Sequence, residues 1–362
     1  MSGITVVVPV HNGEAWIREA VAAILAQGGD RPLEVLLVDD CSTDRSAVIL
    51  VELSQHDGVS VIPGPGRGAA AAINAGVRAA RHPLIAQIDQ DVVVEAGWLS
   101  RLAAELEDPV VAAAQGYYLR APDAGVFARV MNLDLEQRYA GIEGSATDHV
   151  CTGNAMYRAD ALHRVGLFDE SLGYGYDNDI AYRLCEAGYQ LRINRSARAV
   201  HRWREGLRAY LTQQYGFGYG RLDLVARHPR RVGGDSVSPT LMMLHPLLLL
   251  AAAGFGVVGV IAAAMGAASP VWWLLAALIL VALVGERLAS GVVALWRFRD
   301  GAALGFPLVH LLRDAAWVAA IVTWSLRRVG RKPGRPSDSM TPRDAYSVRR
   351  GDSSPAPKRP SR

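Results

Sequence analysis

One stretch, residues 84–91, places the strongest constraint on how this chain can fold. Its apolar residues form a run of strand length that ends abruptly at Asp89, and a second carboxylate, Asp91, follows two residues later. Two carboxylates so close cannot both stay ionised at low cost unless a cation lies between them or water solvates them. A divalent cation with oxygen ligands, Mg²⁺ or Mn²⁺, resolves that conflict and can also hold a diphosphate. For an isolated pair of aspartates a solvated turn is the commoner explanation. The sequence around the pair is therefore needed to distinguish a solvated turn from a cation site.

Alternating strand and helix patterns surround this stretch. Three earlier apolar runs of strand length lie at residues 4–10, 33–38 and 59–62. Each is followed by a segment with helical spacing, and we expect Ser42 or Thr43 to cap the second of these helices. The alternation favours an α/β domain with a parallel, doubly wound sheet.

Polar loops follow these predicted strands, at residues 11–13, 39–40 and 89–91. Ligands of open α/β sheets bind at this edge, where a carboxylate can hydrogen-bond a base or ribose. The glycine-rich loop 64–68 matches no standard phosphate-binding motif. It is either a phosphate-binding loop or a flexible connector, and Arg67 within it either reaches a phosphate or is solvated.

The chain after Asp91 continues with alternating patterns. We predict a helix at 96–106, a strand at 110–118, a helix at 124–141 and a glycine-rich aromatic loop that enters a helix at about Asp177. Asp177 and Asp179 stand in the first turn of that helix, where the dipole stabilises carboxylates. One of them could cap the helix while the other acts as a general base.

Seven stretches, taken in order, resemble the family-2 glycosyltransferases, which have the GT-A fold. They lie at residues 6–12, 38–44, 73–76, 88–91, 152–158, 166–170 and 176–179. The resemblance covers about residues 3–225. It extends to the membrane-anchored members that build bacterial envelope and exopolysaccharide glycans.

The resemblance implies a nucleotide-sugar donor, either a UDP-sugar or a GDP-sugar. Asp40 would contact the nucleotide base, and Pro9, Val10 and Asn12 would line the base and ribose pocket.

The resemblance also implies a metal site and a catalytic base. Asp89 and Asp91 correspond to the Asp-X-Asp motif, in which one residue contacts ribose or diphosphate and the other the metal. His201 takes the position of a late metal or diphosphate ligand, although a structural histidine is about as common there. Asp177 corresponds to the catalytic base, and Asp179 lies beside it as a candidate substrate-binding residue.

Two departures from the family pattern qualify this interpretation. Tyr176 stands where the family usually has Glu, so the role of that Glu is open. Residues 213–221 lack the Gln-X-X-Arg-Trp motif of processive members, which favours transfer of a single sugar. The expected reaction is an inverting displacement without a covalent intermediate, with Asp177 removing the acceptor's proton.

The C-terminal third carries apolar runs of membrane-spanning length. Residues 241–265 are nearly free of charge, and 271–284 continue this after a short break. The second run reaches the length of a crossing if it extends past Glu286 and Arg287. A third run, 302–326, contains His310, Arg313 and Asp314, which are costly inside a span unless they are paired or near an interface.

Basic residues indicate the orientation of these runs. Arg227, Arg230 and Arg231 precede the first run, and Arg297 and Arg299 follow the second, so we expect a hairpin with its ends in the cytoplasm. The basic tail conflicts with three full crossings. Either the third helix lies in the interface or re-enters, or the charge rule fails here. Arg202 and Arg204 could bind diphosphate or anionic headgroups.

The expected organisation has three parts. Residues 1–235 form a cytoplasmic GT-A domain, 236–328 form two or three membrane helices, and 329–362 form a disordered basic tail. The N-terminal run lacks the pattern of a signal peptide. A net charge of only +3 argues against a nucleic-acid partner, and three scattered cysteines indicate neither a disulfide framework nor a zinc cluster.

The expected acceptor lies at the cell membrane, as a lipid-linked sugar or a growing envelope polysaccharide. Two alternatives stay open. A sugar nucleotidyltransferase would need a basic glycine-rich loop after the first strand, which residues 11–14 do not form. A non-catalytic membrane scaffold would not need Asp89, Asp91 and Asp177.

Overall fold

The computed structural model describes residues 2–329 except 30, 122, 143 and 204. Arg204 and the basic tail beyond Val329 lie outside the described residues.

The first half of the catalytic domain is a parallel sheet, as predicted. Its strands are β1 (Ile4–Val10), β2 (Leu33–Asp39), β3 (Val59–Pro63) and β4 (Leu84–Ile88), in the order β3-β2-β1-β4. Side chains of β1 alternate between two hydrophobic cores, one on each face, with Val6 and Val8 in the first and Val7 in the second. A strand covered on both faces reads as a continuous apolar run.

The second half of the sheet is mixed, so the prediction of a purely parallel sheet is wrong there. β8 (Asn154–Arg158) runs antiparallel between β4 and β6 (Val111–Leu119), and β9 (Gln190–His201) lies parallel to β6. The short strands β5 (Val92–Val94) and β7 (Ala146–Thr147) pair antiparallel with β9. Because β8 is reversed, the loop that precedes it lies at the carboxyl end of β4.

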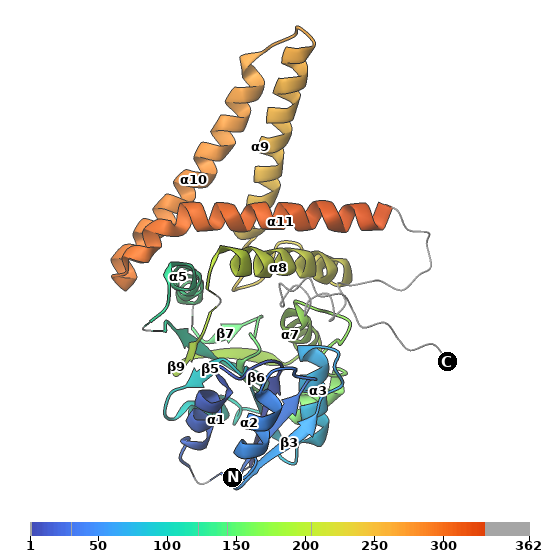
Figure 1. Ribbon diagram of the computed structural model, residues 1–362, viewed down its shortest axis with the longest axis vertical. Coiled ribbons are helices and arrows are strands. Elements are labelled where there is room, and N and C mark those ends of the chain that lie inside the picture. Colours follow the sequence, from blue (N-terminus) through green and yellow to red (C-terminus); the bar gives the residue numbers. More distant parts are fainter. Residues whose placement is uncertain (1, 30, 122, 143, 204, 330–362) are drawn as a thin grey trace.

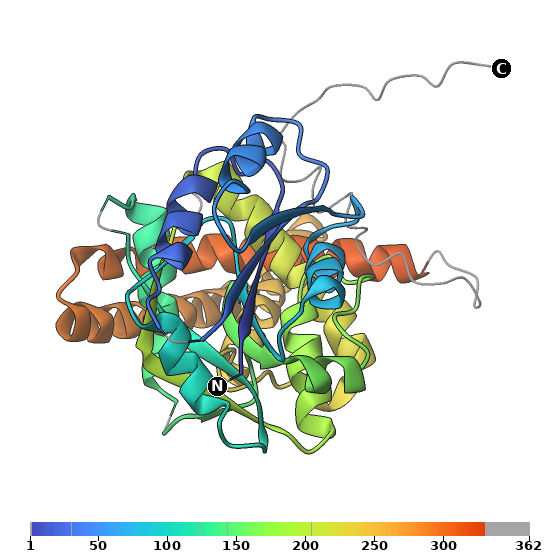
Figure 2. The same cartoon turned by 90° about the horizontal axis from the view of Figure 1, so that it is seen from below.

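Helices cover both sides of the sheet (Figure 2). They are α1 (Ile17–Leu25), α2 (Ser46–Leu53), α3 (Ala69–Ala79), α4 (Trp98–Glu105), α5 (Val126–Ala140), α6 (Ala159–Arg164) and α7 (Tyr176–Glu186). The expected cap of α2 is wrong: its N-cap is Arg45, and no side chain caps it. Ser42 and Thr43 bond Asn12 instead, because β1 and β2 end side by side.

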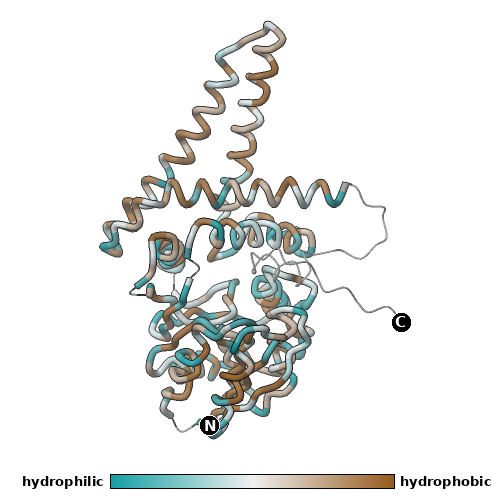
Figure 3. Tube along the Cα trace, viewed as in Figure 1, coloured by the Kyte–Doolittle hydropathy of each residue, from teal (hydrophilic) through white to brown (hydrophobic). Residues whose placement is uncertain are grey.

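The C-terminal third is helical. It consists of α8 (Leu207–Arg227), α9 (Thr240–Ala264), α10 (Pro270–Phe298) and α11 (Phe306–Val329). Three helical segments, Thr240–Ala264, Pro270–Phe298 and Gly301–Arg328, are long and apolar enough to cross a membrane. Apolar residues dominate the hairpin of α9 and α10 (Figure 3).

The third segment differs from the other two in its placement. Figure 1 shows α11 lying across the base of the α9/α10 hairpin, alongside α8. Within its most apolar window 39% is buried inside the protein, against 11% for α9. α11 therefore packs on α8 as well as on α9 and α10.

Candidate active site

Gln90, between the two aspartates, ties the strand-end loops together. Its amide accepts a hydrogen bond from the His11 N–H (2.9 Å) and donates one to the His11 carbonyl oxygen (3.1 Å). The His11 ring Nδ1 lies 2.9 Å from the carbonyl oxygen of Asp40. The loops that the sequence placed at one edge are thus hydrogen-bonded to one another.

Asp40 shapes the glycine-rich loop. Its carboxylate accepts hydrogen bonds from the backbone N–H groups of Gly66 (2.6 Å) and Gly68 (2.9 Å). A Cβ on Gly64 would meet Asp40 Oδ1 at 2.8 Å, so the loop passes the carboxylate closely. Arg67, at the tip of the loop, forms an ion pair with Glu170 at 2.7 Å. Arg67 also lines a cavity whose lining includes Asp89, Asp91 and Asp177, here called the central cavity.

The other residues expected at the nucleotide lie at the same edge of the sheet. Asn12 Oδ1 accepts a hydrogen bond from the Thr43 N–H at 2.7 Å. Val10 is fully buried, and Pro9 is half-buried at the end of β1. Neither these residues nor Asp40 is among the described residues that line the central cavity.

Asp89, Asp91 and His201 all line the cavity, but their ligand atoms do not all lie within 4.8 Å of one another. The antiparallel pairing of β5 with β9 sets Val92 opposite His201, which brings His201 Nε2 to 3.5 Å from Asp91 Oδ1. Asp89 Oδ1 accepts a hydrogen bond from Gln87 Nε2 at 2.9 Å. The two carboxylates fit Mn²⁺ or Mg²⁺, and the imidazole adds a nitrogen donor of the kind that transition metals accept.

The start of α7 separates the two candidate acids. Its N-cap is Gly175, whose φ of 78° favours glycine, so neither aspartate caps the helix. Asp177 is half-buried and lines the cavity. Asp179 is buried outside the cavity lining, where it accepts bonds from Arg183 (2.6 and 2.8 Å) and contacts His228 Nε2 at 2.9 Å. The structure therefore brings Asp177, and not Asp179, to the site.

Two neighbours of Asp177 escaped the sequence analysis. Ligand atoms of His149, Cys151 and Asp177 lie within 4.8 Å of one another. Burial, then the charges of Asp177 and Asp89, raise the pKa of the Cys151 thiol well above its usual range. Without a bound metal the Cys151 thiol is therefore protonated at neutral pH. The carboxylates of Asp89 and Asp91 are the harder ligands, which Mn²⁺ and Mg²⁺ prefer. Only the reversed direction of β8 brings this loop to the site.

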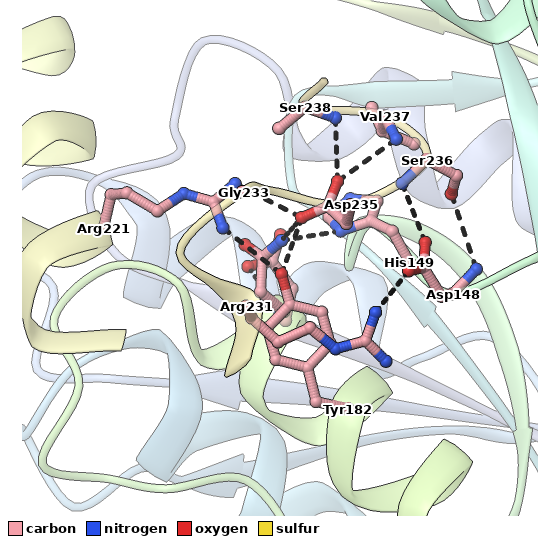
Figure 4. Close-up of polar contacts among 12 residues, drawn as sticks. Asp148, His149, Tyr182, Arg221, Arg231, Gly233, Asp235, Ser236, Val237 and Ser238 are labelled. Carbon is pink, nitrogen blue, oxygen red and sulfur yellow. Dashed lines mark hydrogen bonds and ion pairs between the residues drawn. The ribbon is translucent and has the colours of Figure 1, made fainter. Parts of the chain in front are cut away.

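Residues 229–239, which lead from α8 into α9, fold back onto α7 (Figure 4). The fully buried Asp235 carboxylate of this segment accepts hydrogen bonds from Asn178 Nδ2 (3.0 Å) and Tyr182 OH (2.7 Å), and it forms an ion pair with Arg221 (3.2 Å). The backbone N–H groups of Val237 and Ser238 bond its other oxygen.

This network affects both charge and position. Burial alone would raise the pKa of Asp235, but His149, Arg221 and the hydrogen bonds lower it to about 2. Asn178, which Asp235 holds, directly follows Asp177. The segment that leads into the apolar helix α9 therefore fixes the first turn of α7.

The cavity extends from Asp89, Asp91 and Asp177 to α8 and α11. It has a volume of about 340 Å³, and its far end is lined by Gln213, Phe217, Arg313 and Trp317. Gly218 lets α8 approach α11, since a Cβ there would meet Trp317 Cα at 3.0 Å. On its other side α8 supports Tyr174 of the loop before α7.

A mixed sheet with an acidic pair at the carboxyl end of β4 defines a GT-A fold. The chain matches the model of glycosyl transferase family 2 over residues 5–166. An uncharacterized glycosyltransferase of Mycobacterium bovis is 32% identical over 195 residues, which are 52% of this chain and 81% of that relative. The chain belongs to glycosyl transferase family 2.

Two further similarities cover more of the chain. The pre-mycofactocin glycosyltransferase of Mycobacterium tuberculosis is 30% identical over 299 residues, which are 80% of this chain and 58% of that protein. A mannosyltransferase from Pyrobaculum calidifontis, in complex with GDP-mannose and Mn²⁺, has the same fold, with a TM-score of 0.59 at 21% identity. That match covers 90% of this chain and 88% of the mannosyltransferase.

Proposed function

We propose that the protein transfers one sugar from a UDP- or GDP-sugar to a hydroxyl group of a membrane-associated acceptor, with inversion at the anomeric carbon. One observation carries this proposal: Asp89, Asp91 and Asp177 face a single cavity that continues to the apolar helix α11. A lipid-linked sugar or an envelope polysaccharide is the acceptor expected at such a site.

The side chains have distinct tasks in this reaction. Asp89, Asp91 and His201 would hold Mg²⁺ or Mn²⁺, which when bound neutralises charge on the donor's diphosphate. Asp177 accepts the proton of the acceptor hydroxyl as its oxygen forms a bond to the anomeric carbon. The bond from that carbon to the nucleoside diphosphate breaks on the opposite face, and the diphosphate keeps the electron pair.

The helices suggest how the protein sits in the membrane. We place residues 1–235 in the cytoplasm and the α9/α10 hairpin through the membrane and back. α11 lies at the interface, where it supports the catalytic domain. This arrangement keeps both the basic residues near the hairpin and the start of the tail on one side, in agreement with the charge rule.

Hydrolysis of a panel of UDP- and GDP-sugars by the detergent-solubilised full chain tests the proposal. We expect one donor to be hydrolysed with Mn²⁺ or Mg²⁺ and not with EDTA. Asp177→Asn should lower the rate roughly a hundredfold or more, and Asp91→Ala should abolish the response to metal. Asp57→Asn is the control, because it removes an exposed carboxylate in the loop between α2 and β3, outside the cavity lining. No turnover of any donor would instead favour the scaffold.

A further inference from the structure

The far end of the cavity has buried polar groups whose hydrogen-bonding capacity is unused. Trp317 Nε1, Gln213 Oε1, Tyr174 OH and His310 Nδ1 are buried and have no hydrogen-bond partner among the described residues. All four residues line the cavity, and His310 and Trp317 are more than nine-tenths buried. Such groups are rare in native proteins, and a bound ligand is one way to satisfy them.

These groups line one cavity from different elements: Gln213 is on α8, His310 and Trp317 are on α11, and Tyr174 is in the loop before α7. Tyr174 packs on α8, with its ring 5.5 Å from that of Phe217, and it precedes Asp177 by three residues. Trp317 packs against Gly218 on the same helix. A ligand in this part of the cavity would therefore be bordered by the loop that leads to Asp177, by α8 and by α11.

The charges of the cavity argue against a phosphate at this end. Every described arginine that lines the cavity has a carboxylate partner, although the buried Nε of Arg202, next to His201, makes no hydrogen bond. The pairs are Arg67–Glu170, Arg138–Asp134, Arg202–Asp123, Arg221–Asp235 and Arg313–Asp314, at 2.7 to 3.2 Å. A phosphate would have to compete with these carboxylates for its donors.

The unused groups instead match a neutral ligand. Trp317 Nε1 can only donate, Gln213 Oε1 can only accept, and Tyr174 OH can do both. Hydroxyl groups satisfy all of these, whereas phosphate oxygens cannot satisfy an acceptor. Aromatic walls with a few polar groups are typical of small-molecule sites.

We propose that this end of the cavity binds a neutral, hydroxyl-rich unit of the acceptor, which is a saccharide and not a phosphate headgroup. The inference rests on the proposed function for its role in the reaction. Binding itself does not depend on the donor or the metal, so it can be tested separately.

Equilibrium dialysis of the full chain in lipid nanodiscs tests the inference. The probes are radiolabelled hexyl β-glucoside and hexyl phosphate, without nucleotide sugar or metal, and empty nanodiscs are the blank. We expect the glucoside to bind and hexyl phosphate not to displace it. Trp317→Phe, which keeps a ring and removes the N–H, should weaken binding roughly three- to tenfold.

The same helix offers a matched control. Trp324 Nε1 donates to Asp223 Oδ1 at 2.9 Å and Trp324 does not line the cavity, so Trp324→Phe should bind the glucoside like the wild type. Gln213→Met, on α8, gives an independent test with the same expected loss.

Either of two results would overturn the inference: hexyl phosphate binds and the glucoside does not, or Trp317→Phe and Gln213→Met both bind the glucoside like the wild type. Loss of donor hydrolysis would overturn the proposed function and leave this binding result as it stands.

Discussion

The buried Asp235 carboxylate provides the sharpest test of how the segment before the apolar helix α9 holds the candidate active site. Asp235→Asn keeps the shape of the side chain and removes the charge that faces Arg221, whose side chain is 10% exposed. Breaking one partner of a buried pair costs about 3–5 kcal/mol, because the other charge stays buried without compensation. For a domain of this size the loss corresponds to a fall in unfolding midpoint of roughly 6 to 20 °C.

Thermal unfolding of the detergent-solubilised protein measures this loss. Asp123→Asn is the matched control, since Asp123 also pairs with an arginine but its side chain is 73% exposed, and exposed pairs contribute little. The double variant Asp235→Asn with Arg221→Gln should recover part of the loss, because no unpaired charge remains. A midpoint for Asp235→Asn within 1 °C of the wild type would refute the reasoning.

Three further predictions follow from the same contacts. Gly220→Ala would put a Cβ 2.6 Å from Tyr174 Cβ and 2.9 Å from the Tyr174 carbonyl oxygen. We therefore expect the loop before α7 to shift and kcat for donor hydrolysis to fall about tenfold or more. Gly254 has open space around it, so Gly254→Ala should change neither kcat nor KM. Asp179→Asn should lower the unfolding midpoint, because Arg183 loses its buried partner. The folded fraction should keep its specific activity, and a clear loss of activity per folded molecule would contradict this assignment. The pKa of Asp235 is about 2 in the folded protein against an ordinary value of 3.8. The ionised carboxylate therefore contributes about 2 kcal/mol to the free energy of unfolding above pH 4, and this contribution is lost as the pH falls toward 2. The difference in unfolding midpoint between wild type and Asp235→Asn should therefore narrow between pH 5 and pH 2.5, and a constant difference would exclude this linkage.

The sequence by itself determined the elements and much of the chemistry. Strand and helix periods are local, so the parallel strands, the acidic residues that follow them and the apolar membrane runs could be read directly. The carboxyl ends of parallel strands share one edge, which also placed residues 11–13, Asp40 and Asp89 together. The order of the motifs then predicted a glycosyltransferase fold. The sequence did not predict whether the glycine-rich loop 64–68 binds a phosphate or is a flexible connector.

Tertiary structure decided which of these residues share a site. Position in the helix did not separate Asp177 from Asp179, and only the family resemblance favoured Asp177 as the base. Packing turns Asp177 to the cavity and Asp179 to Arg183 and His228. The reversed β8 brings Cys151 to Asp177, 26 positions away, and the returning segment buries Asp235 beside Asn178, 57 positions away. The physical reason is that such pairings depend on strand direction, helix docking and the burial of charge. These are properties of the assembled chain, and no local pattern carries them.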